Sequence, residues 1–166
     1  MFLTIIAGTL AILVDQATKH VAFNMQAEVV NLTSFLTIHK VLNRGAAFGF
    51  LGQTENSNLI LILLSIVTIA SLAILIKNHK KLSLLGKIPF GLIIGGALSN
   101  LFDRIYYGYV KDFIYFHYNR FSWPTFNFAD VFICIGVLLL LITFLRPHAD
   151  KEASTAPSED TTAQAV

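Results

Sequence analysis

Residues 88–107, IPFGLIIGGALSNLFDRIYY, carry no charge over about their first 15 positions and then place Asp103 next to Arg104. As an α-helix, about 15 residues reach only about 22 Å, whereas the hydrocarbon core of a bilayer is about 30 Å thick. The segment is apolar enough to enter a membrane but too short to carry its two charges clear of it. We therefore expect Asp103 and Arg104 to lie at or inside the membrane boundary, where an ionised side chain is costly and usually functional.

Three more apolar segments place the chain among membrane proteins. Its 166 residues are 55% hydrophobic and 13% charged, with a mean hydropathy of +0.66, which is too apolar for an ordinary soluble domain. The sequence predicts an all-α polytopic membrane protein with four transmembrane helices, over about residues 2–24, 58–76, 88–107 and 130–145. The first is expected to be retained rather than cleaved as a leader, because no basic region precedes it and Asp15 and Lys19 interrupt its apolar run.

The basic residues set the expected orientation. Lys77, Lys80, Lys81 and Lys87 crowd the connection between the second and third helices, which has no acidic residue, so the positive-inside rule places it in the cytoplasm. With four spans, both termini are then cytoplasmic, and the connections at about 25–57 and 108–129 lie outside. Residues 1–146 form the expected membrane domain. The polar segment 147–166 is expected to be a disordered cytoplasmic tail, because it has too little apolar surface to fold.

The two outer connections differ in composition. Residues 29–41 are rich in Val, Ile, Thr and Phe, which predicts short strands in this connection. A tight turn is expected to follow at Asn43-Arg44-Gly45-Ala46-Ala47-Phe48, where Asn and Gly tolerate unusual backbone angles. Residues 108–129 are strongly aromatic, and aromatic side chains concentrate at membrane interfaces, so this connection is expected to lie along the outer surface.

Polar residues gather near the outer end of the predicted bundle. Asp15 lies about 21 Å along the first helix, close to the depth of Asp103. Asn100, Asp103 and Arg104 are three and four positions apart and are predicted to share a helix face. Asp15 with Lys19, and Asp103 with Arg104, could each form a structural ion pair, and this alternative stays open. The same segment also offers small residues for close helix packing: Gly91, Gly95 and Gly96.

Two more aspartates flank the last outer connection, in Val110-Lys111-Asp112-Phe113 and Phe126-Asn127-Phe128-Ala129-Asp130. Either one alone could be a helix cap. Two carboxyls close together share a proton, so one can activate water while the other polarises a carbonyl. This is aspartyl peptidase chemistry, which needs no metal, no cofactor and no covalent nucleophile. The sequence has neither an HExxH zinc helix nor a GxSxG elbow.

Together these motifs resemble those of the lipoprotein signal peptidases, or signal peptidase II, of bacterial membranes. The resemblance extends to about Arg146 and also includes Asp15-Gln16-x-x-Lys19 and Gly95-Gly96-Ala97-x-x-Asn100-Leu101-x-Asp103-Arg104. It implies four transmembrane helices with a small extracytoplasmic β-cradle, and a catalytic pair at Asp112 and Asp130. The supporting or substrate-contacting residues that it implies are Asp15, Lys19, Asn43, Gly45, Asn100, Asp103, Arg104 and Asn127.

The resemblance also implies a substrate and a location. The substrates would be prolipoproteins that carry diacylglycerol on a cysteine, cleaved just before that cysteine. The location would be the bacterial cytoplasmic (inner) membrane, with the active site near the outer leaflet. We expect a monomer in contact with membrane lipid. The net charge of +2 is too small to suggest a nucleic-acid partner.

Two other functions stay open from the residues alone. A small multi-span transporter or ion pathway could use Asp15, Asp103 and Asp130 as a relay, although short helices and the lack of an inverted repeat disfavour it. The chain could also be an assembly factor whose polar cluster is structural. Cys134, the single cysteine, lies in an apolar run and is expected to be a small buried hydrophobe.

Overall fold

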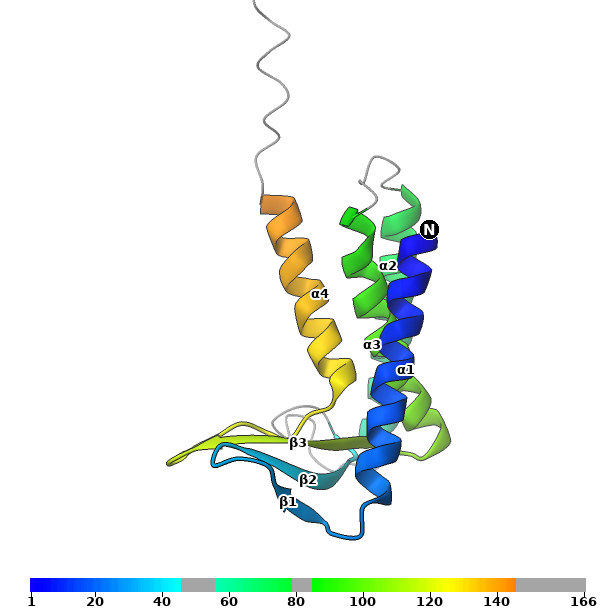
Figure 1. The fold of residues 1–166 in the computed structure, drawn as a ribbon. Helices are drawn as coiled ribbons and strands as arrows, with labels where there is room; N and C mark the ends of the chain where they lie inside the picture. The colour runs from blue at the N-terminus through cyan, green and yellow to red at the C-terminus, as the bar shows by residue number, and fades with distance from the viewer. Residues whose placement is uncertain (46–55, 79–84, 146–166) are drawn as a thin grey trace, which may run out of the picture.

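Four long helices dominate the computed structural model, which describes residues 1–45, 56–78 and 85–145 (Figure 1). They are α1 (Phe2–Asn24), α2 (Ser57–Asn78), α3 (Ile88–Tyr106) and α4 (Phe128–Leu145), with a short 3-10 turn, η2 (Leu85–Lys87), before α3. Among the described residues, α1, α2 and α3 are long and apolar enough to cross a membrane, and α4 contains a shorter apolar stretch, Phe128–Thr143. The predicted tail 147–166, the predicted turn at Ala46–Phe48 and the pair Lys80 and Lys81 lie outside the described residues.

A small antiparallel sheet closes one end of the helices. Its strands, in the order β1-β2-β3-β4, are β1 (Val29–Asn31), β2 (Leu36–Asn43), β3 (Val110–Tyr118) and β4 (Phe121–Ser122). The chain's N-terminus and the end of α4 lie at the opposite end (Figure 1). Because β2 comes from the connection between α1 and α2 and β3 from the connection between α3 and α4, their pairing joins parts of the chain that are far apart in sequence.

The aromatic connection contains a strand that the sequence did not predict. Residues 110–118 alternate without a clear polar face, and their aromatic content was assigned to a membrane interface. In the structure they form β3, the longest strand, which pairs with β2 so that Val41 lies opposite Asp112 and Asn43 opposite Val110. The pairing brings together residues that are far apart in the sequence, such as Asn43 and Asp112, whose side chains are hydrogen-bonded across 69 positions. A pattern read over a few neighbouring residues therefore gave no sign of it.

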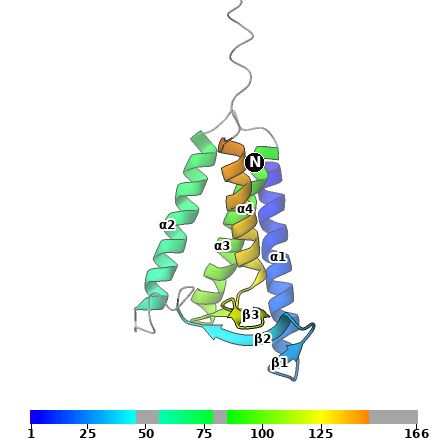
Figure 2. The ribbon, with the colours of Figure 1, turned by 90° about the vertical axis from the view of Figure 1, so that its left-hand side faces the viewer.

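Helix α3 is central, because it packs against α1, α4 and α2. Glycines allow the closest of these contacts: a Cβ atom at Gly95 would lie 2.7 Å from the Cα atom of Gly8 in α1, and one at Gly96 would lie 2.5 Å from the carbonyl oxygen of Ala129 in α4. The predicted close-packing surface is thus present. Helix α2 stands at the side of the bundle, away from α1 (Figure 2), and buries only Ser57 and Ile76.

Gly95→Ala is expected to destabilise the protein, since the added methyl group would meet the backbone of Gly8 and push α1 away from α3. Overpacking of this kind typically costs about 1–3 kcal/mol. Thermal unfolding in detergent measures the effect. Leu98→Ala, which changes a partly exposed side chain on the same helix, is the matched control. Equal unfolding temperatures for Gly95→Ala and the unsubstituted protein would contradict the packing argument.

Candidate active site

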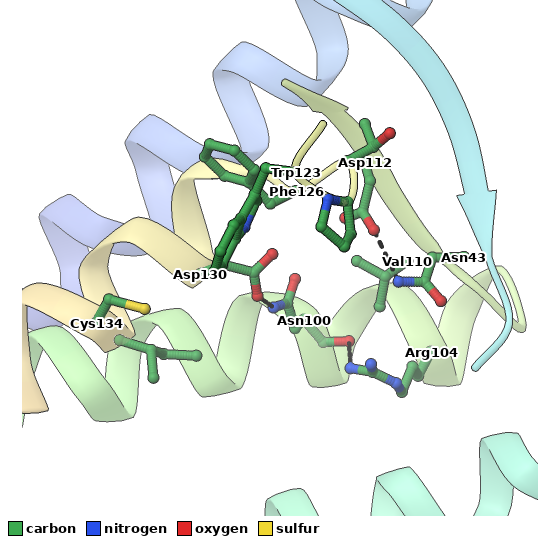
Figure 3. Close-up of a pocket in the computed structure, with 12 residues that line it drawn as sticks. Asn43, Asn100, Arg104, Val110, Asp112, Trp123, Phe126, Asp130 and Cys134 are labelled. Carbon is green, nitrogen blue, oxygen red and sulfur yellow. Dashed lines mark hydrogen bonds between the residues drawn. The ribbon is translucent and has the colours of Figure 1, made fainter. Parts of the chain in front are cut away.

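A cavity of about 340 Å³ opens where β3, the second half of α3 and the first turn of α4 meet (Figure 3). Asp112 from β3 and Asp130 from α4 point into it from different sides. Trp123, Pro124, Phe126 and Ile133 form much of its apolar wall. The polar lining includes Asn43, Asn100, Arg104, Asp112, Thr125 and Asp130.

Asp112 is almost fully buried and is held by two amide donors. The side-chain nitrogen of Asn43 donates to Oδ2 at 2.8 Å, and that of Asn127 donates to Oδ1 at 2.6 Å. Burial in a poorly solvated site is the main reason that the pKa of Asp112 is raised to about 7; the negative charge of Asp130 acts in the same direction, while the two amides and Lys19 oppose the change. This carboxyl therefore changes its protonation state near neutral pH.

Asp130 caps the N-terminus of α4 and also lines the cavity. Its Oδ2 accepts the backbone N–H of Asn127 at 3.2 Å, and its own N–H donates to Oδ1 of Asn127 at 3.1 Å. This reciprocal pair caps the N-terminus of α4, where a carboxylate is favourable. The other oxygen, Oδ1, accepts the side-chain nitrogen of Asn100 at 2.9 Å. Asn127 thus connects both aspartates, since its amide reaches Asp112 and its backbone reaches Asp130.

Beneath the cavity lies a buried ion cluster formed by Asp15, Lys19 and Asp103. The ammonium nitrogen of Lys19 lies 2.7 Å from Asp15 and 2.8 Å from Asp103. All three side chains are at most 1% exposed. Charges that are buried this deeply persist only when they are paired and hydrogen-bonded. The cluster therefore ties α1 to α3 at the level of the cavity.

The alternative in which Asp103 pairs with Arg104 is wrong. Neighbouring residues on an α-helix point about 100° apart, so Asp103 faces α1 and pairs with Lys19, whereas Arg104 turns to the cavity. Its Nη1 donates to the backbone oxygen of Asn100 at 3.3 Å. The predicted common face holds in two parts: Asn100 lines the cavity with Arg104, and it contacts the ammonium of Lys19 together with Asp103.

Residues 43–45 are the described part of the predicted turn, and within them the Gly45 N–H donates to Oδ1 of Asn43 at 3.0 Å. That bond turns the Asn43 amide nitrogen toward Asp112. The structure thus brings all ten predicted site residues to the cavity, to the ion cluster or directly behind them.

Other residues of the site were not predicted. Gln16 donates to Oδ1 of Asp103 at 3.0 Å, and the hydroxyl of Ser99 donates to Oδ2 of Asp15 at 2.6 Å. The sequence gives little indication of their role, because both side chains are uncharged and each is simply adjacent to a predicted site residue, Asp15 or Asn100. Trp123, on the link between β4 and α4, lines the cavity and was treated only as part of an aromatic surface.

Cys134 was predicted to be buried, and this is wrong. Its side chain is exposed and lines the cavity, one helical turn after Asp130 (Figure 3). Residues four apart lie on the same face of a helix, so the position of Asp130 at the cavity brings Cys134 there too. Because Cys134 is flanked by apolar residues, the sequence does not indicate which face of the helix lines the cavity.

Several apolar helices with a carboxylate-lined cavity at one end define a multi-pass membrane protein that carries a polar site. Comparison with known proteins gives the family. The family described as Signal peptidase (SPase) II matches residues 7–146. A protein of Anaplasma marginale (strain Florida) named lipoprotein signal peptidase is 37% identical over 94% of this chain and 92% of its own length. One of the same name from Azoarcus sp. (strain BH72) is 42% identical over 82% and 79%. The chain belongs to the signal peptidase II family.

Solved structures agree with this assignment. Two structures described as a bacterial membrane enzyme, determined by the in meso method at 2.3 Å and 1.9 Å resolution, are each 28% identical to this chain. The first has a TM-score of 0.78 and covers 93% of this chain and 94% of its own. The second has a TM-score of 0.75 and covers 86% and 92%. The helices and the sheet are therefore similar in arrangement to those of membrane enzymes.

Asp112→Asn is expected to stabilise the protein at pH 8 and to have little effect at pH 4. Because the pKa of Asp112 is raised in the folded state to about 7, folding favours the protonated form, and this contribution is lost as the pH rises through 7. The cost of ionisation, about 1.4 kcal/mol per pKa unit, is absent in the variant. The gain is reduced because an amide offers only one oxygen to the donors Asn43 and Asn127.

Thermal unfolding in detergent between pH 4 and pH 8 tests this expectation. Glu28→Gln, at a side chain that is 76% exposed, is the control for removing an acid. A difference between Asp112→Asn and the unsubstituted protein that stays constant over the whole pH range would contradict the raised pKa.

Proposed function

We propose that this chain is an aspartic endopeptidase of the membrane, that it removes signal peptides from prolipoproteins, and that Asp112 and Asp130 are its catalytic pair. The observation that carries the proposal is geometric: two carboxyls, one from β3 and one from α4, face a single cavity and are connected by Asn127. Membership of the signal peptidase II family supports the substrate class, as do relatives named lipoprotein signal peptidase. The transporter alternative has no such support.

In the proposed reaction, the two carboxyls share one proton. The ionised member accepts a proton from water, and the water oxygen attacks the carbonyl carbon of the scissile peptide bond. The protonated member donates a hydrogen bond to the carbonyl oxygen. The tetrahedral adduct then collapses, the C–N bond breaks, and a proton passes to the leaving nitrogen. A pKa of about 7 for Asp112 supports a pair that is singly protonated near neutral pH.

The supporting residues act through hydrogen bonds in this proposal. Asn43 and Asn127 orient Asp112, and Asn100 orients Asp130. Arg104 lines the cavity and presents a cation beside the two carboxyls, so it is placed to bind an oxygen atom of the substrate backbone. None of these three asparagines gains or loses a proton near neutral pH, so their role is orientation.

We also propose the topology and the location. The protein crosses the bacterial inner membrane four times, residues 1–146 form its monomeric membrane domain, and the tail 147–166 and both termini are cytoplasmic. Lys77 in the last turn of α2 and Lys87 before α3 support this orientation, because they lie at the end opposite the sheet. The sheet and the cavity then lie near the outer leaflet, where the lipid of a diacylglyceryl cysteine would place the bond just before that cysteine.

Asp112→Asn and Asp130→Asn are each expected to lower the rate of cleavage by about 10³-fold or more, because each removes one ionisable member of the pair. The double variant is expected to lose little more, since residues that act as a unit are not additive. Purified protein in detergent, incubated with a diacylated prolipoprotein, reports the rate by release of the mature form on a gel. Glu28→Gln is the control, as an exposed acid that does not line the cavity. Near-normal turnover by either single variant would overturn the assignment of the pair.

Cleavage is expected to depend on the lipid of the substrate. A precursor in which serine replaces the lipidated cysteine lacks the group that holds the bond at the depth of the cavity. Positioning contributes up to about 7–11 kcal/mol to catalysis, so the unlipidated precursor should lose turnover as well as binding. Equal kcat and KM for the lipidated and unlipidated precursors would contradict presentation by the lipid while leaving the aspartate pair in place.

A further inference from the structure

Lys19 is a buried cation with a partner for each of its three N–H donors. Its ammonium nitrogen lies 2.7 Å from Oδ2 of Asp15 and 2.8 Å from Oδ2 of Asp103, and it donates to Oδ1 of Asn100 at 3.1 Å. The two carboxylates belong to different helices, α1 and α3. Without the ammonium between them, they would repel each other in a site of low dielectric constant.

Each carboxylate of this ion cluster also holds the backbone directly before one aspartate of the proposed catalytic pair. The N–H of Ala129, the residue before the aspartate on α4, donates to Oδ1 of Asp15 at 2.8 Å. The N–H of Lys111, the residue before the aspartate on β3, donates to Oδ2 of Asp103 at 3.3 Å. The two carboxylates of the ion cluster are therefore hydrogen-bonded to the backbone on the two sides of the cavity.

A third connection passes through side chains. An ammonium group only donates, so Asn100 must turn its Oδ1 toward Lys19. Its nitrogen then faces Asp130 and donates to Oδ1 at 2.9 Å. Asn127 favours the same orientation, because its side-chain nitrogen donates to Oδ1 of Asn100 at 3.1 Å. Lys19 and Asn127 thus fix the orientation of the Asn100 side chain, so that its nitrogen and not its oxygen faces Asp130.

We infer that Lys19 is a positioning residue for the aspartate pair: by neutralising both carboxylates of the ion cluster it sets the separation of Asp112 and Asp130, and by orienting Asn100 it keeps a donor on Asp130. Lys19 does not line the cavity and touches no substrate in this scheme. The inference deepens the proposed function, on which its catalytic part rests, while the connections themselves are geometric.

The charged groups that face Asp112 decide the direction of the expected change. They are Asp130 from α4, Lys19 from α1 and Arg104 from α3, and the strand β2 contributes the neutral donor Asn43. Removing the positive charge of Lys19 leaves the two carboxylates of the cluster unbalanced. The loss of a nearby positive charge and the excess negative charge of the cluster both favour the protonated carboxyl of Asp112, so its titration should move to higher pH.

The test uses Lys19→Gln. The stability difference between the protein and its Asp112→Asn variant reports the titration of Asp112 without any activity measurement. In the Lys19→Gln background, the pH at which this difference levels off is expected to rise by about one unit. The acidic limb of the profile of kcat/KM against pH should move in the same direction. We expect kcat, per folded molecule, to fall about tenfold or more while KM changes by less than about threefold, because misplaced reacting groups lower turnover.

Ser99→Ala is the matched control, since it removes a buried hydrogen bond of 2.6 Å to Asp15 in the same cluster but changes no charge. It is expected to lower the unfolding temperature and to leave both pH profiles in position. If Lys19→Gln were destabilised like the control and kept both pH profiles and the kcat of the unsubstituted protein, Lys19 would be structural only and the inference would be overturned.

A second variant keeps the test decisive if Lys19→Gln does not accumulate. Lys19→Gln combined with Asp103→Asn has the same net charge in the cluster as the unsubstituted protein, so repulsion no longer opposes folding. We expect its kcat to be about tenfold below that of Asp103→Asn alone, and equal values would overturn the inference. Failure of the proposed function would show differently, as full activity of the Asp112→Asn variant.

Discussion

The buried ammonium of Lys19 lies between the carboxylates of Asp15 and Asp103. Much of the structure supplies the hydrogen bonds that offset the cost of burying these charges. Unpaired, each of these charges would cost several kcal/mol or more to bury. In the structure, Asp15 receives a hydroxyl and a backbone N–H, and Asp103 receives an amide and a backbone N–H. The partners come from α1, α3, α4 and β3. Satisfying one buried ion cluster thus requires four elements to meet at one point.

That meeting depends on small residues. Because Gly95 lies against Gly8, the axes of α1 and α3 come close enough for the Lys19 side chain to reach Asp103. Gly96 allows the start of α4 to approach the other side of α3. The polar centre and the apolar helix contacts are therefore one arrangement. A bulkier residue in the helix contacts would separate partners that have no water to replace them.

The sequence predicted the parts of this arrangement that follow from local spacing. Apolar runs and lysines indicated the helices, and the shortness of the segment before Asp103 placed the polar residues at one depth. The pairing of Lys19 with Asp103 was not predictable in this way, because it depends on how α1 and α3 are rotated relative to each other. The hydrogen bond from Ser99 to Asp15, which joins residues 84 positions apart, depends on the same rotation. The strand β3 was missed for a similar reason, since its partner lies in the other connection.

The same non-local pairing sets when the site can exist during synthesis. Asn43 leaves the ribosome early, Asp112 follows after two further helices, and Asp130 comes last, at the start of α4. A chain in which only the first three helices have inserted has one carboxyl of the proposed pair and no cap from Asn127 to Asp130. A growing chain of this protein therefore carries no completed cavity. The cavity is complete only once α4, the last helix, packs against α3 and brings Asp130 to it.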